Sequence, residues 1–186
     1  MASADLSHLE TAKQANAIVK KKLTIGPGNR WFSGMGAALC VKLQRRESTR
    51  EIERRATDIK RKAAAAGKGQ AAEWAKWEQV IGIWAKNAEA HHCGNCAEHA
   101  AIAFTYLKNA GTRPIEYMGY LSGYFEDHAF VVIGRKPDSD INKPVAWGSD
   151  VAICDPYYGK AYPAARIESE MGSKAKRAPK LICRLG

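Results

Sequence analysis

The sequence predicts an α+β fold, in which N-terminal helices pack on a C-terminal antiparallel sheet. Up to Leu107, apolar side chains recur every three or four residues, as they do along one face of a helix. From Pro114 onward, they alternate with polar residues or form short β-branched runs between turn residues, as in strands. Because the helices precede the strands instead of alternating with them, an α+β arrangement is favoured over a parallel α/β sheet.

Three helices are expected in the first half of the chain. The first covers residues 5–23 and ends at a Gly- and Pro-containing break at residues 24–29. The second covers residues 35–66, and its part from residue 42 to residue 62 is strongly basic. The third covers residues 71–88. Its core-facing stripe has the spacing i, i+3, i+4, i+7 and consists of Trp77, Val80, Ile81 and Trp84.

Strands are expected at residues 115–120, 127–134, 146–154 and 180–184. We divide the chain into a basic helical N-terminal portion, residues 1–70, and a core, residues 71–186, within one compact unit.

The composition limits where the protein acts and what it binds. The chain has 186 residues and a formal charge of +10, which suits acidic partners or serves only solubility. The basic helix 42–62 is the expected contact with an acidic or anionic surface, and no motif for specific nucleic-acid binding is present. We expect a cytoplasmic protein, or one exported without a cleaved signal peptide. The five cysteines are too sparse and odd in number for a disulfide framework, which indicates a reducing compartment.

Cys96 lies where a helix is expected to begin. Gly94 permits a tight turn, Asn95 is a favoured N-cap, and Glu98 three residues later completes a capping box. The positive end of the helix dipole should lower the pKa of Cys96, and the first backbone N–H groups can stabilise an oxyanion. The alternative is a buried structural cysteine that follows a helix cap.

His128 and Asp155 each lie in a predicted strand. Pairing of the two strands would bring the Asp155 carboxylate to the His128 imidazole, whereas Asp127 points to the opposite face of a regular strand. A helix cysteine, a strand histidine and a strand aspartate can act as nucleophile, base and orienting group. The alternatives are a half-buried histidine and an Asp-Pro turn.

Three sequence blocks carry a resemblance to a known family. They are Gly94-Asn95-Cys96-Ala97-Glu98-His99, Asp127-His128-Ala129-Phe130-Val131-Val132-Ile133-Gly134 and Ile153-Cys154-Asp155-Pro156-Tyr157-Tyr158. Together they resemble the papain/transglutaminase-like superfamily, and within it the dermonecrotic-toxin-like papain-fold family of bacterial toxins and injected effectors. The likeness covers roughly residues 77–165, and residues 1–70 match no family known to us.

The resemblance implies a papain/transglutaminase-like fold with Cys96 as nucleophile, His128 as base and acid, and Asp155 as orienting group. It further implies a cofactor-free enzyme that is secreted without a cleaved signal peptide and deamidates a glutamine, or an asparagine, of a protein in the target-cell cytoplasm. Proteolysis is the second expectation and transamidation the third. An immunity protein or a delivery module is an implied partner.

The sequence departs from this family pattern at two positions. Ala90 stands where papain-like proteases have a glutamine that supplies an oxyanion donor, so Asn87, His92 or Trp84 is left for that role. Ala97 stands where eukaryotic transglutaminases have a tryptophan, which weakens the cross-linking interpretation.

Other functions remain open from the residues alone. A dense set of potential metal ligands surrounds Cys96, but without a second ligand pair elsewhere we expect no metal site. This set consists of His91, His92, Cys93, Cys96 and His99. Cys93 is expected to form a reversible disulfide with Cys96 under oxidising conditions. A non-enzymatic alternative is a basic binding module formed by residues 1–70.

Overall fold

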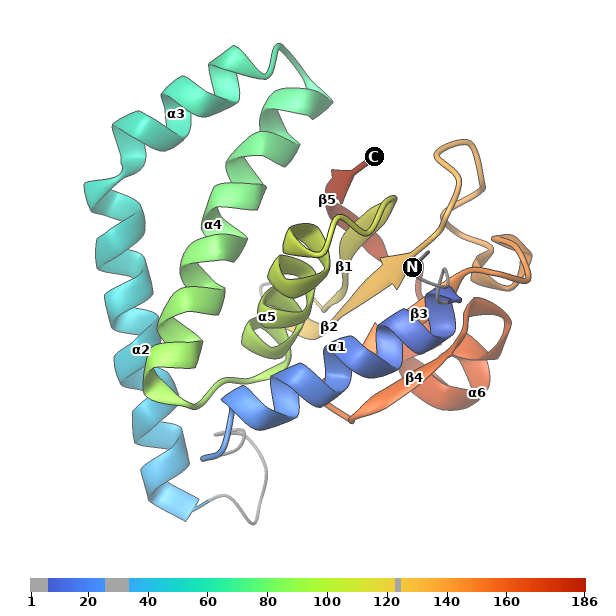
Figure 1. Cartoon of the computed structure of the whole chain (residues 1–186), viewed down its shortest axis with the longest axis horizontal. Coiled ribbons are helices and arrows are strands. Elements are labelled where there is room, and N and C mark those ends of the chain that lie inside the picture. The colour runs from blue at the N-terminus through green and yellow to red at the C-terminus, as the bar shows by residue number, and fades with distance from the viewer. Residues whose placement is uncertain (1–6, 26–33, 123–124) are drawn as a thin grey trace, which may run out of the picture.

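The computed structural model describes residues 7–25, 34–122 and 125–186, and it confirms the α+β class (Figure 1). The helices are α1 (His8–Lys22), α2 (Gly34–Arg54), α3 (Ala56–Ala65), α4 (Gln70–His91), α5 (Cys96–Asn109) and α6 (Ile167–Met171). The strands are β1 (Ile115–Ser122), β2 (Phe125–Ile133), β3 (Ala152–Asp155), β4 (Lys160–Pro163) and β5 (Lys180–Leu185).

The five strands form one antiparallel sheet in the order β4-β3-β2-β1-β5. Strand β2 therefore lies in the centre, between β1 and β3, and Val131 of β2 is opposite Cys154 of β3. This register sets the two segments that carry His128 and Asp155 side by side, as the sequence-based strand pairing requires.

The sheet separates two hydrophobic cores, because successive side chains of a strand point to opposite faces. Ala129, Val131 and Ile133 join the core shared with α1, α4 and α5. Phe130 and Val132 join the core on the other face, which is closed by segments near Trp147 and by Ile167 of α6. The large helices thus cover one face of the sheet and the short C-terminal elements cover the other.

Helix α1 belongs to the main core, although it falls within the N-terminal portion that we separated at residue 70. Ala12, Ala15 and Val19 are fully buried and pack in the same core as the alanines of α5. Their spacing of three and four residues gives α1 one continuous apolar face. No gap in packing therefore separates α1 from the C-terminal half of the chain.

The predicted helix 35–66 is wrong in one respect, because the chain forms two helices that meet at Arg55. Arg55 has φ −94° and ψ 5°, which ends α2 and lets α3 begin in a new direction. Both α2 and α3 pack along α4 (Figure 1). As expected, the α4 stripe faces the core: Val80 and Ile81 are buried, and the two tryptophans pack against the core.

The predicted strand 146–154 is too long. Residues Pro144–Ala146 form a short 3-10 helix, and the strand begins only at Ala152. Strand β4 and helix α6 were not predicted, because each is too short for its periodicity to be recognised. The predicted break at residues 24–29 lies mostly outside the described residues.

Candidate active site

His128 and Asp155 form a buried pair at the centre of the sheet. The Nε2 atom of His128 lies 2.8 Å from Oδ2 of Asp155, and both residues are only 1% exposed. Since a carboxylate can only accept a hydrogen bond, Nε2 carries the shared proton. The other ring nitrogen, Nδ1, is then the one that can exchange a proton with a reacting group.

A β-bulge precedes His128 and redirects the strand. Tyr120 of β1 pairs with His128, but the next residue, Leu121, pairs with Glu126, so Asp127 is passed over in the ladder. A bulge locally twists and bends its strand, and bulges are frequent beside active sites, where they re-aim a side chain. The side chain of Asp127, which we considered as a rival orienting group, lies outside the described residues.

Two tyrosines from the turn after Asp155 enclose the imidazole of His128. Its ring centroid lies 6.0 Å from that of Tyr157 and 5.1 Å from that of Tyr158. Phe130 stacks on it from within the sheet at 6.2 Å. This aromatic environment excludes water from the pair, which strengthens the electrostatic interaction between imidazole and carboxylate.

Cys96 is the first residue of α5, and the predicted capping box is confirmed. The Glu98 carboxylate accepts a hydrogen bond from the backbone N–H of Asn95 at 2.7 Å, and the Asn95 side chain accepts one from the backbone of Glu98. Cys96 is partly exposed and carries a thiol outside any disulfide. It therefore sits at the positive end of the helix dipole, where a thiolate is stabilised.

Glu98 also joins this helix start to α2. Its two carboxylate oxygens accept hydrogen bonds from Arg45 at 2.7 and 3.1 Å. Burial by itself would raise the pKa of Glu98, but the Arg45 guanidinium and the N–H of Asn95 hold this pKa below its usual value. A charged carboxylate thus fixes the segment that presents Cys96.

One chain of ring contacts between α5 and His128 runs through Tyr157. His99, one turn after Cys96, makes a hydrogen bond between its Nδ1 and the Asn95 carbonyl at 2.7 Å. The His99 ring lies 5.5 Å from the Tyr157 ring, which in turn contacts His128. The structure therefore joins His128 to Asp155 directly, and joins the first turn of α5 to this pair through an aromatic bridge.

A hollow of about 320 Å³ opens beside Cys96. Its walls come from α2 and α4 as well as from the first turn of α5, and its lining residues are Arg45, Ser48, Thr49, Trp84, Cys96, Ala97 and Glu98. Part of the N-terminal helical portion therefore forms one wall of the space next to the thiol.

Of the three expected oxyanion donors, Trp84 is the one that lines this hollow. The Asn87 amide is buried between α2 and α4, where it donates to Ser48 Oγ at 3.2 Å and to Glu51 at 3.3 Å. The exposed His92 bonds through Nδ1 to the Lys22 carbonyl at 2.9 Å. The structure thus gives both Asn87 and His92 partners away from the thiol.

The predicted pairing of Cys93 with Cys96 is not the one in the structure, because Cys93 forms a disulfide with Cys40 of α2. The pairing could not be recognised from the sequence because 53 positions separate the two cysteines. The bond ties the loop before Cys96 to α2, next to the Arg45–Glu98 ion pair.

The potential metal ligands near Cys96 have separate partners. His91 bonds through Nε2 to Glu47 at 2.7 Å, and Cys93 is in the disulfide. Among the described residues, no group of three or more histidine, cysteine or acidic side chains is arranged to hold a metal ion.

Tyr157 and His99 are the site residues that the sequence-based reasoning left without a catalytic role. Tyr157 follows directly after Asp155-Pro156, and His99 lies three residues after Cys96, so proximity to the motif residues was the available signal.

Comparison of the chain with models of protein families, with curated proteins and with solved structures finds no match. None of the helices within the described ranges has the length and apolar character that crossing a membrane requires.

Proposed function

We propose that the protein is a cysteine-dependent amide hydrolase with a papain/transglutaminase-like arrangement of Cys96, His128 and Asp155. The observation that carries the proposal is the buried hydrogen bond between His128 and Asp155, in strands that pack against the helix beginning with Cys96. The proposal is further supported because the sequence pattern alone indicates all three residues for this chemistry, and because His128 and Asp155 contact each other directly.

In the proposed reaction, the Cys96 thiolate attacks an amide carbonyl carbon, and the carbonyl oxygen becomes an oxyanion. The first backbone N–H groups of α5 stabilise this oxyanion, with Trp84 as the candidate second donor. The protonated His128 gives its proton to the leaving nitrogen as the carbon–nitrogen bond breaks, which leaves a thioester on Cys96. Water, deprotonated by His128, then attacks the thioester and releases a carboxylic acid and the free thiolate.

Asp155 orients the imidazole throughout this cycle. Its bond to Nε2 leaves Nδ1 as the nitrogen that exchanges a proton with the reacting atoms, and its charge stabilises the imidazolium that forms. Because the pair is buried, water does not compete with Asp155 for the hydrogen bond to Nε2 of His128.

The favoured reaction is deamidation of a glutamine or asparagine side chain. The hollow beside Cys96 measures about 320 Å³, near the lower limit for small-molecule sites, which suits one side chain. Together with the resemblance of the sequence blocks, this favours a bacterial toxin or effector that modifies a protein of its target cell.

Mass spectrometry of a target-cell lysate tests the proposal. The wild-type protein should convert a glutamine or asparagine of a protein to the acid, and Cys96→Ala should abolish the conversion. Asp155→Asn should slow it by about 10²- to 10⁴-fold, because the imidazole loses its orienting charge. Asp138→Asn is the matched control, since Asp138 is an exposed turn residue outside the three motif blocks.

Retention of the conversion by Cys96→Ala would refute a thiol mechanism. Cut peptide chains in place of deamidated ones would keep the mechanism but change the substrate to a peptide bond.

A further inference from the structure

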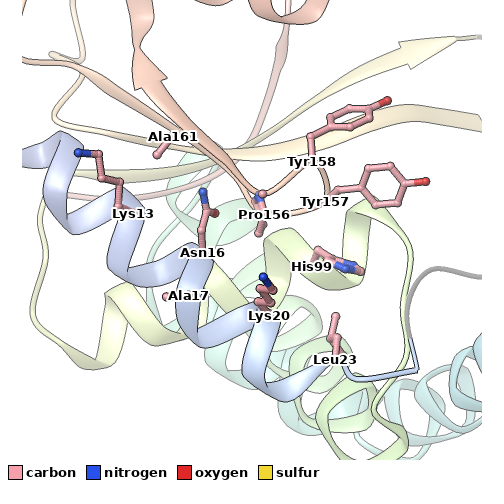
Figure 2. A pocket seen from close by; sticks show the side chains of 11 residues that line it. Lys13, Asn16, Ala17, Lys20, Leu23, His99, Pro156, Tyr157, Tyr158 and Ala161 are labelled. Carbon is pink, nitrogen blue, oxygen red and sulfur yellow. The ribbon is translucent and has the colours of Figure 1, made fainter.

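A second depression of about 590 Å³ lies between α1 and the turn that follows β3 (Figure 2). One wall is α1, which contributes the exposed Lys13, Ala17 and Lys20 and the buried Asn16. The opposite wall is the turn with Tyr157 and Tyr158, and His99 of α5 lies between the two walls. We call this depression the α1 groove.

The α1 groove adjoins the candidate active site. Its wall residue Tyr157 contacts His128, and its lining residue His99 lies one turn after Cys96 on α5. The C-terminal end of α1 is fixed to the loop before Cys96, because His92 binds the Lys22 carbonyl and accepts a hydrogen bond from the Ile25 N–H at 3.0 Å. A chain bound along α1 would therefore reach the thiol region without leaving the surface.

The groove is electropositive. Lys13 and Lys20 are seven residues apart, which places them on the same face of α1 and about 10 Å apart along the helix. Lys174 adds a third cation from the other side, with its Nζ 5.5 Å from the centroid of the Tyr158 ring. Glu10 offsets part of this charge by pairing with Lys13 at 3.1 Å. Among the described residues that line the groove, none is a carboxylate.

We propose that the α1 groove is a substrate subsite that binds an acidic segment of the protein substrate next to the amide attacked by Cys96. This inference rests on the proposed amide hydrolase function. An extended segment advances about 3.3 Å per residue, so carboxylates about three residues apart match the separation of Lys13 and Lys20. The tyrosine rings on the opposite wall offer flat apolar surface and hydroxyl groups to the same segment.

A binding experiment with two matched peptides tests this subsite. The acidic probe is fluorescein-labelled Glu-Ala-Ala-Glu-Gly-Gln-Gly-Glu-Ala-Ala-Glu, and the neutral probe has serine in place of each glutamate. Fluorescence anisotropy is measured with the full-length Cys96→Ala variant, so that no turnover occurs. We expect the acidic probe to bind more tightly, and to weaken as salt is added.

Lys20→Glu should weaken binding of the acidic probe by about fivefold more than Lys21→Glu, on the scale of surface charge pairs. Lys21 is the matched control, because it is the next residue of α1, is exposed, and does not line the groove. Circular dichroism should show the same folded state for both variants.

Three results would overturn the subsite. Equal affinity for the two probes would show that the groove has no preference for acidic segments. Equal losses of affinity in Lys20→Glu and Lys21→Glu would show that binding depends on overall charge and not on the groove. A thymine oligonucleotide serves as a competitor. If it displaces the acidic probe, binds more tightly than the probe and loses affinity in Lys20→Glu, the groove is a nucleic-acid site. Binding is measured without turnover, so the two proposals can fail separately. Absence of deamidation by the wild type would refute the proposed function, whereas the peptide affinities would still show whether the groove binds acidic segments.

Discussion

Removal of the Glu98 carboxylate should destabilise the protein by an amount that the structure sets. Glu98 is buried and holds two connections: one to the backbone N–H of Asn95 and a bidentate one to Arg45. Loss of the capping bond costs about 1 kcal/mol. The Arg45 pair adds about 1 to 2 kcal/mol, a range reduced from that of a fully buried pair because the Arg45 side chain is 50% exposed. Glu98→Ala should therefore lower the free energy of unfolding by about 2 to 3 kcal/mol.

Urea unfolding monitored by circular dichroism measures this loss. Glu73→Ala is the matched control, because Glu73 also lies in the first turn of a helix but is exposed and pairs with the exposed Lys76 at 3.5 Å. The control should change the free energy of unfolding by no more than about 0.5 kcal/mol. A loss for Glu98→Ala that does not exceed the control would refute the reasoning that this carboxylate fixes the start of α5.

The stabilisation by Glu98 should also depend on pH in a defined direction. The folded state lowers the pKa of Glu98 below the value of 4.5 expected for an unfolded chain. The charged carboxylate therefore contributes its full stabilisation above about pH 4.5, and this contribution disappears as the pH falls through the lowered pKa. The stability difference between wild type and Glu98→Gln should be constant near neutral pH and should shrink only in acid. A difference that grows in acid would contradict the assignment.

Two further predictions concern the cysteines. Iodoacetamide at neutral pH, followed by mass spectrometry, should label Cys96 well before Cys154 and Cys183. The reason is that burial raises the pKa of Cys154 and raises the pKa of Cys183 to about 12. Equal labelling of Cys183 would contradict an activated thiol at Cys96. Cys40→Ser should lower the free energy of unfolding by about 4 kcal/mol in oxidised protein, because the disulfide closes a loop whose ends are 53 positions apart in the sequence. Addition of dithiothreitol should remove most of this difference, and a difference that persists in full would show that packing at residue 40, and not the disulfide, is responsible.

The helices and the central strands could be predicted from the sequence because their apolar period is regular over many residues. The break at Arg55 could not, since neither glycine nor proline marks it and the basic face continues on both sides. Strand β4 has only four residues, too few for an alternation to stand out. The capping box at Asn95 was predictable because it depends on residues within one turn.

Features of the site that depend on distant segments were harder to predict. The apolar patterns predicted both strands, but the meeting of His128 and Asp155 depended on the pairing of these strands, which the register of β2 with β3 supplies. The Cys40–Cys93 disulfide depends on how α2 packs against α4, which no local pattern determines. The sequence also could not rank Trp84 among the three candidate oxyanion donors. Its position beside Cys96 depends on how α2, α4 and α5 pack together to form the hollow.

The residues around Cys96 come from separate parts of the fold, and this affects how the protein can change over evolutionary time. The paired His128 and Asp155 belong to the sheet, whereas Ser48 and Thr49, which wall the hollow, belong to a helix that packs mainly on α4. Exposed residues of α2 can thus be exchanged without disturbing either hydrophobic core. Under the proposed function, new target preferences can arise by substitution at exposed positions of this helix such as Thr49, while His128 and Asp155 are kept unchanged.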